Sequence, residues 1–147
     1  MQIELKIKKL PQILQANAVE KSLRRAVMIA AETYVRDVHY WIDSGRAFTP
    51  RTGNLQRSIT WYMATENSAR IIAQADYAKY VEFGTKPHAI LPNKRRKALK
   101  IPTPEGYIFR KKVSHPGSKP YPFFFANLQD RAKRVAVEFM RALEGVI

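Results

Sequence analysis

SITWYMATENSARIIAQA, residues 58–75, is the stretch that decides the fold class of this chain. Residues 58–64 and 70–75 are rich in β-branched and aromatic side chains, which favour β-strands. The connection between them is polar and suits a hairpin turn, with Glu66, Asn67 and Ser68. The stretch therefore predicts two antiparallel strands joined by a tight turn.

Two patterns before this hairpin supply a further strand and a helix. Residues 2–8 alternate, with Ile3, Leu5 and Ile7 on one face, and predict a half-buried strand. From residue 11 to 42, apolar residues recur at spacings of three and four, which predicts an amphipathic helix. Pro11 fits its first turn. A helix of about 30 residues spans roughly 45 Å, so it must pack along most of the sheet or reach a neighbouring subunit. Residues 43–54 predict a loop, with Gly53 at a positive φ.

Two helices are predicted after the hairpin. Asp76 is the candidate N-cap of a short helix that Gly84 ends. Residues 123–143 predict a second amphipathic helix, with Pro122 in its first turn and Phe124 in the core. We therefore expect one α+β domain, residues 1–147, in which a small antiparallel sheet packs against a long N-terminal helix and a C-terminal helix.

Between these elements lies an irregular excursion, residues 86–122, which holds seven of the nine prolines. Residues 98–101 and 107–113 predict the arms of a hairpin around the turn Pro104-Glu105-Gly106. An irregular segment of this length is usually functional, or disordered when alone. We therefore expect a long basic loop or hairpin that projects from the domain.

The net charge of +14 indicates a polyanionic partner or an acidic surface. The excess is concentrated in residues 79–119, where eleven basic residues face only Glu82 and Glu105. The candidate residues for contact with phosphates or with an acidic partner are Lys94, Arg95, Arg96, Lys97, Lys100, Arg110, Lys111 and Lys112. Tyr107 and Phe109 alternate with Ile108, which indicates strand packing rather than base stacking.

The residue types argue against several kinds of site. No cysteine is present, so disulfides and thiolate metal ligands are excluded. The three histidines, His39, His88 and His115, do not form a pair at metal-ligand spacing, and no serine has a nucleophile-elbow context. We expect no metal, no cofactor and no enzymatic activity. No apolar run is long enough for a signal peptide or a membrane span, so we expect no membrane partner.

Three blocks in a fixed order carry a resemblance to a known family. They are Arg51-Thr52-Gly53-Asn54-Leu55 followed by Ser58-Ile59, then Tyr77-Ala78-Lys79-Tyr80-Val81-Glu82-Phe83-Gly84-Thr85, then His115-Pro116-Gly117 followed by Pro122-Phe123-Phe124. With a long helix before them, the blocks resemble the neck or tail-component family of long-tailed bacteriophages, in the lambdoid head–tail joining group. The likeness runs from about residue 10 to the C-terminus.

The resemblance implies a structural virion protein of the head–tail junction that is made in the host cytoplasm. Copies of it would form a homo-oligomeric ring between head-closure proteins and the tail-terminator or tail-tube proteins, with DNA passing through the channel. The residues it implies for subunit or partner contacts are Arg51, Thr52, Gly53, Leu55, Tyr77, Tyr80, Glu82, Phe83, Gly84, Thr85, His115, Pro116, Gly117 and Tyr121.

Two alternatives from other classes stay open. The first is a nucleic-acid-binding module that grips phosphates through residues 94–97, and the second is a small ribonuclease. The basic segment is equally consistent with a solvated loop or with an arm that docks on an acidic neighbouring subunit.

Overall fold

A computed structural model describes residues 1–6 and 17–144 of the chain. Its main sheet has the order β1-β3-β2, with β1 Gln2–Lys6, β2 Ile59–Thr65 and β3 Ser68–Ala73, and both pairings are antiparallel. The predicted hairpin is confirmed as β2 and β3. In β1 the side chains alternate between exposed and half-buried, as predicted, because only one face of the strand meets the core. Residues 7 and 8 of the predicted strand lie outside the described residues.

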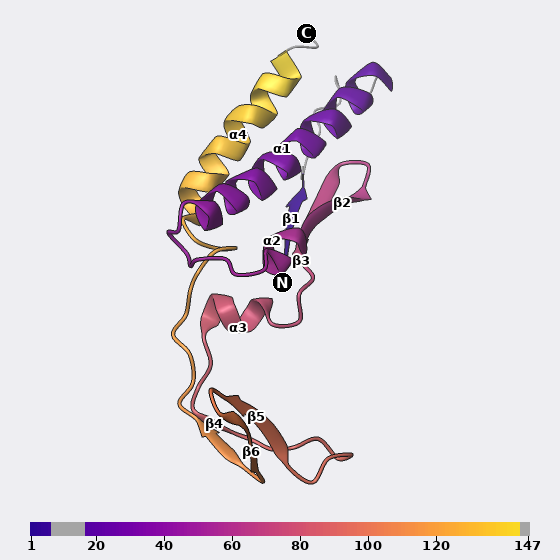
Figure 1. Cartoon of the computed structure of the whole chain (residues 1–147). Helices are drawn as coiled ribbons and strands as arrows, with labels where there is room; N and C mark the ends of the chain where they lie inside the picture. The colour runs from indigo at the N-terminus through magenta and orange to yellow at the C-terminus, as the bar shows by residue number, and fades with distance from the viewer. Residues whose placement is uncertain (7–16, 145–147) are drawn as a thin grey trace.

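The long helix α1, Asn17–Asp43, packs against the main sheet and contacts all three of its strands (Figure 1). Tyr34, Val38 and Ile42 lie on its buried face and join Ile71 of β3 in the core. Removing such apolar side chains from water is the main stabilising contribution, about 25 cal/mol per Å². The amphipathic prediction is confirmed from residue 17 onward, while Pro11 and the rest of 11–16 lie outside the described residues.

Helix α4, Leu128–Glu144, packs along α1 (Figure 1). The prediction that this helix begins at residue 123, with Pro122 in its first turn, was wrong. Phe123 and Phe124 are fully buried, but they precede the helix in an irregular segment that ends at Asn127, whose φ is 49°. The α+β class itself is confirmed.

Two short helices lie between the long ones. Helix α2, Asn54–Arg57, forms at the end of the predicted loop, directly after Gly53, which has the predicted positive φ of 67°. Helix α3, Ala78–Phe83, ends at Gly84 as predicted. Asp76 is not its N-cap, because the helix begins one residue later than that position requires, after Tyr77, without a side-chain capping bond.

Residues 86–122, called the arm from here on, project away from the rest of the described chain, called the body (Figure 1). The arm contains two antiparallel ribbons. Strand β4, His88–Ile90, pairs with β7, Val113–His115, and β5, Leu99–Thr103, pairs with β6, Gly106–Arg110. The predicted hairpin is therefore confirmed as β5 and β6, while the β4–β7 pair was not predicted. Among the described residues, no helix is both long and apolar enough to cross a membrane.

Candidate functional site

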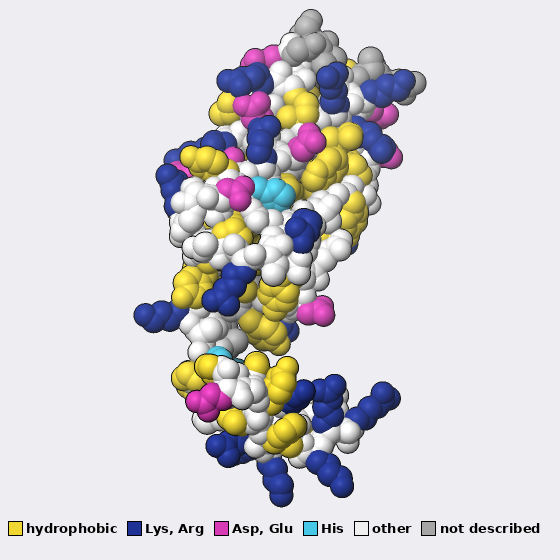
Figure 2. All heavy atoms as spheres, in the orientation of Figure 1, with side chains coloured by type: hydrophobic (Ala, Val, Ile, Leu, Met, Phe, Trp, Pro, Cys, Tyr) yellow, Lys and Arg dark blue, Asp and Glu magenta, His cyan; other side chains and the backbone are white. Residues whose placement is uncertain are grey.

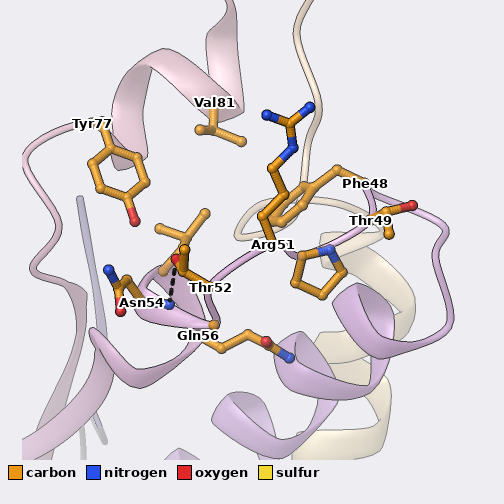
Figure 3. A pocket seen from close by; sticks show the side chains of 11 residues that line it. Phe48, Thr49, Arg51, Thr52, Asn54, Gln56, Tyr77 and Val81 are labelled. Atoms are coloured by element: carbon orange, nitrogen blue, oxygen red, sulfur yellow. Dashed lines mark hydrogen bonds between the residues drawn. The ribbon is translucent and has the colours of Figure 1, made fainter.

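The first two sequence blocks meet at a cavity of about 300 Å³ beside α2 and α3. Figure 3 shows Arg51 and Thr52 on one side of it and Tyr77 and Val81 on the other. Arg57 holds the first block in place, because its guanidinium donates to the carbonyl oxygen of Thr52 at 3.0 Å and to the side-chain oxygen of Asn54. Leu55 is buried beneath this surface, so it supports the block rather than facing a partner.

Glu82 is buried, although the resemblance implied that it contacts a partner. Its carboxylate accepts hydrogen bonds from three consecutive backbone N–H groups, those of Phe123, Phe124 and Phe125, at 2.8, 2.9 and 3.0 Å. These bonds between an ionised acceptor and backbone donors are stronger than neutral ones. Glu82 therefore fixes the segment by which the chain returns from the arm to α4.

Arg131 completes the same buried network from α4. It is 1% exposed, and its guanidinium donates to the carbonyl oxygens of Phe124 and Phe123 at 2.6 and 3.4 Å. It also lies over the ring of Tyr34, whose hydroxyl donates to the carbonyl oxygen of Phe124 at 2.6 Å. Side chains from α1, α3 and α4 thus bond the N–H groups and carbonyl oxygens of residues 123–125. These bonds anchor the returning chain where it leaves the arm.

Burial raises the pKa of Tyr34 above its ordinary value of 10.0, and the neighbouring Arg131 opposes this only in part. In the unfolded chain the phenol loses its proton first, so its contribution to stability is complete below pH 10 and is lost as the pH rises above 10. We expect Tyr34→Phe to lower the free energy of unfolding by about 1 kcal/mol at pH 8. The difference between the two proteins should shrink between pH 10 and pH 11 in urea titrations. A difference that stays constant over this range would contradict the assignment.

Two glycines allow the outgoing and returning chains to come into close contact where the arm leaves the body. The chains meet there in an antiparallel bridge between Thr85 and Ser118, which we call the crossing. Thr85 and Ser118 exchange both backbone hydrogen bonds, at 3.0 and 3.1 Å. A Cβ atom on Gly84 would lie 2.4 Å from the carbonyl oxygen of Ser118, and one on Gly117 would lie 2.3 Å from that of Thr85. Both glycines also have a positive φ. The crossing therefore requires glycine at both positions, and it joins the second and third sequence blocks.

His88 and His115 stack just beyond the crossing, with ring centroids 5.0 Å apart. The Nδ1 atom of His88 donates to the carbonyl oxygen of Lys86, while that of His115 accepts from the N–H of Gly117. These bonds fix different tautomers, so the unbonded Nε2 of a neutral His115 carries a proton and is not free to bind a metal. In the described part of the chain, no three potential metal ligands of the His, Cys, Asp or Glu type are grouped.

An aromatic band lies on and beside α3. We define it as Tyr77, Tyr80, Phe83 and Tyr121, which are 44%, 50%, 64% and 45% exposed. The ring of Phe83 stacks on that of Phe125, which places the band directly over the segment that Glu82 holds. These four residues come from two sequence blocks and the returning chain, and the fold brings them to one region.

The predicted basic residues lie on the arm, well separated from the aromatic band. Figure 2 shows that dark-blue side chains crowd the far end of the arm and point outward in several directions. The loop of residues 94–97 is a turn held by Asn93, whose side chain accepts from the N–H of Arg95 at 2.8 Å. Tyr107 and Phe109 do lie in a strand, but the expectation that they pack was wrong, because they are 60% and 63% exposed.

Sequence reasoning had found the blocks but not the buried network between them. In the sequence Glu82 stands out only as part of a motif, and Arg131 carries no sign of burial, because its charge fits the polar face of a helix. No local signal reveals such a pairing, since the bonded groups lie 41 to 43 residues from Glu82. The stacking of His88 on His115 was equally invisible in the sequence.

Comparison with known proteins gave one result. The family described as "Bacteriophage HK97-gp10, putative tail-component" matches residues 2–84, which include the main sheet, α1, the first sequence block and the second block as far as Gly84. Searches of curated proteins and of solved structures found no match. The family match covers more than half of the chain and contains every element of the body except α4, together with all the residues that line the cavity. This protein therefore belongs to the HK97-gp10-like family of bacteriophage tail components.

Proposed function

We propose that this protein is a subunit of the neck ring that joins the head to the tail, and that it acts as a structural component without a catalytic site. The whole chain, residues 1–147, would act as one domain. Its partners would be further copies of itself, the head-closure proteins, and the tail-terminator or tail-tube proteins. It would be located at the head–tail junction of the virion, after assembly in the host cytoplasm. Membership of a tail-component family supports the structural role.

The aromatic band is the observation that carries this proposal. Four aromatic side chains that are 44–64% exposed lie on α3, directly before it, and on the returning chain where Tyr121 donates its N–H to the carbonyl oxygen of Val81. Aromatic side chains dominate the centres of protein–protein interfaces, and a cluster of them in water is otherwise unfavourable. A ring subunit needs two different complementary surfaces, one for each neighbour. The band is one such surface, and the projecting arm gives the chain the reach to touch a neighbouring subunit.

The test is a stop codon in this gene in a phage that carries it, followed by electron microscopy of the lysate. We expect filled heads separate from intact tails, because the joint is missing. Wild-type protein supplied from a plasmid should restore joined virions. The pair Tyr80→Ser and Tyr121→Ser should not, because it removes two of the four exposed rings of the band while the fully buried core is left unchanged.

The matched control carries two serine substitutions at exposed apolar side chains of the body, Tyr40→Ser and Met140→Ser, which are 64% and 53% exposed in the wild type. We expect it to restore joined virions. Joined virions in the stop-codon lysate would remove the neck assignment. Full rescue by the Tyr80 and Tyr121 variant would leave the neck assignment intact but would remove the band from it.

A specific observation also favours the second candidate, a module that contacts DNA. The basic residues of the arm are exposed, and in the described part of the chain none of them forms an ion pair with an acidic residue of the body. In the ring, such an arm would be placed to make non-specific contact with DNA in the channel, or to dock on an acidic neighbouring protein.

A further inference from the structure

The cations of the arm lack ionic partners. The arm contains ten basic residues and one acidic residue, Glu105. Among the described residues, all five ion pairs lie within the body, such as Arg134 with Asp37 and Arg24 with Glu66. All ten basic side chains of the arm are exposed. Like charges gathered on one projection repel one another, so the isolated arm carries an electrostatic cost that a polyanion would remove.

One face of the β5–β6 hairpin combines these cations with two exposed rings. Lys100 pairs with Phe109 and Pro102 pairs with Tyr107 across the ladder, so all four side chains lie on the same face. The ring of Phe109 is 63% exposed and that of Tyr107 is 60% exposed. The Nζ atom of Lys100 lies 3.7 Å from the centroid of Tyr107, so a cation and a flat ring are presented side by side.

The loop beside this hairpin presents four consecutive cations. Asn93 closes the turn, because its carbonyl oxygen accepts from the N–H of Arg96 at 2.9 Å and its side chain from that of Arg95. The four side chains from Lys94 to Lys97 are all exposed, and Figure 2 shows Lys and Arg side chains pointing outward from the far end of the arm. The turn therefore displays positive charge in several directions rather than on one flat surface.

Charge decides which partner fits this arm. The rest of the chain carries sixteen basic and eleven acidic residues, so a second copy offers the arm another positively charged body. DNA offers one negative charge about every 1.7 Å, and its major groove, about 12 Å wide, admits a two-stranded β-ribbon. Exposed rings beside cations are the combination with which proteins hold single-stranded nucleic acid.

We infer that the arm binds DNA without sequence preference, with the cations of residues 94–97 on phosphates and with Tyr107 and Phe109 against exposed bases. The inference deepens the proposed function and rests on it for the presence of DNA beside the ring. The test uses the full-length protein alone, so it can fail while the stop-codon phenotype still places the protein at the joint.

The experiment measures fluorescence anisotropy of labelled duplex DNA and of a labelled single strand, each in two unrelated sequences, over a range of salt concentrations. The tip variant replaces Lys94, Arg95, Arg96 and Lys97 by glutamine. The charge-matched control replaces four exposed cations of the body by glutamine, namely Lys21, Arg25, Arg36 and Lys133. A third variant, Tyr107→Ser with Phe109→Ser, leaves the charge unchanged. Polyglutamate serves as a competitor with the chemistry of an acidic protein.

We expect equal affinity for both sequences. In the tip variant, the slope of the logarithm of the binding constant against the logarithm of the salt concentration should become shallower by about 2 to 4, since each lost phosphate contact removes about 0.9 from the slope. The control should keep the wild-type slope. The variant with Tyr107→Ser and Phe109→Ser should bind the single strand about fivefold more weakly at every salt concentration. Equal losses in the tip variant and the control, or competition by polyglutamate as strong as that by DNA, would overturn the inference. Unchanged single-strand binding by the Tyr107→Ser and Phe109→Ser variant would show that these two aromatic side chains do not contact bases.

Discussion

Replacing Glu82 by alanine should lower the free energy of unfolding by about 3 to 5 kcal/mol, which is a large part of the stability of a small protein. The change leaves three N–H groups, those of Phe123, Phe124 and Phe125, without their acceptor, and the first two are fully buried. Each buried donor that loses its partner costs about 1 to 3 kcal/mol. Urea denaturation followed by circular dichroism measures the loss.

Two further variants make this result interpretable. Glu66→Ala removes an exposed carboxylate that pairs with Arg24 at the surface, and we expect a loss below about 1 kcal/mol. Glu82→Gln keeps one carbonyl acceptor, so it should fall between alanine and the wild type and remain measurable if Glu82→Ala does not fold. A loss at Glu82→Ala no larger than that at Glu66→Ala would show that the three hydrogen bonds do not hold the returning segment.

Gly84→Ala should open the crossing between the arm and the body. The added Cβ would lie 2.4 Å from the carbonyl oxygen of Ser118, and the backbone at φ 69° and ψ −176° belongs to a region that almost only glycine adopts. Overlap and backbone strain together cost about 2 to 4 kcal/mol. We expect protection of the Thr85 and Ser118 amides from hydrogen exchange to fall by about 30-fold or more, because the two strands would separate locally.

The matched control is Gly45→Ala, because Gly45 has nearly the same φ, 70°, and a Cβ there meets nothing within 4 Å. It separates the cost of the positive φ from the cost of the close approach. The exchange of amides in the core of the body, such as that of Ile71, should not change in either variant. If Gly84→Ala kept the Thr85 and Ser118 amides as protected as Gly45→Ala does, the close contact at the crossing would be refuted.

Glu82→Ala and Gly84→Ala both alter the attachment of the arm to the body. Glu82 anchors the returning chain inside the body, and the glycine crossing holds the two chains together where they leave it. A neck subunit that reaches a neighbour or DNA through its arm needs that arm at a fixed angle, because each side chain at its tip is useful only if the base is rigid. Loss of either device should leave a folded core with a poorly placed arm.

The sequence by itself determined the elements whose signals are local. The strands β1, β2 and β3 and the hairpin β5–β6 follow from side-chain alternation and from polar turns, which involve residues only a few positions apart. The amphipathic character of α1 and α4 and the positive φ of Gly53 were likewise readable. The three sequence blocks were also sufficient to point to a phage tail component, the family to which the chain belongs.

Only the tertiary structure decided the start of α4, the burial of Arg131, the stacking of His88 on His115 and the exposure of Tyr107 and Phe109. Each depends on a group more than twenty residues away, or on the lack of one, so no local pattern contains it. A helix that began at residue 123 would bond the carbonyl oxygens of Phe123 and Phe124 to N–H groups four residues further on, but these oxygens accept instead from the side chains of Arg131 and Tyr34.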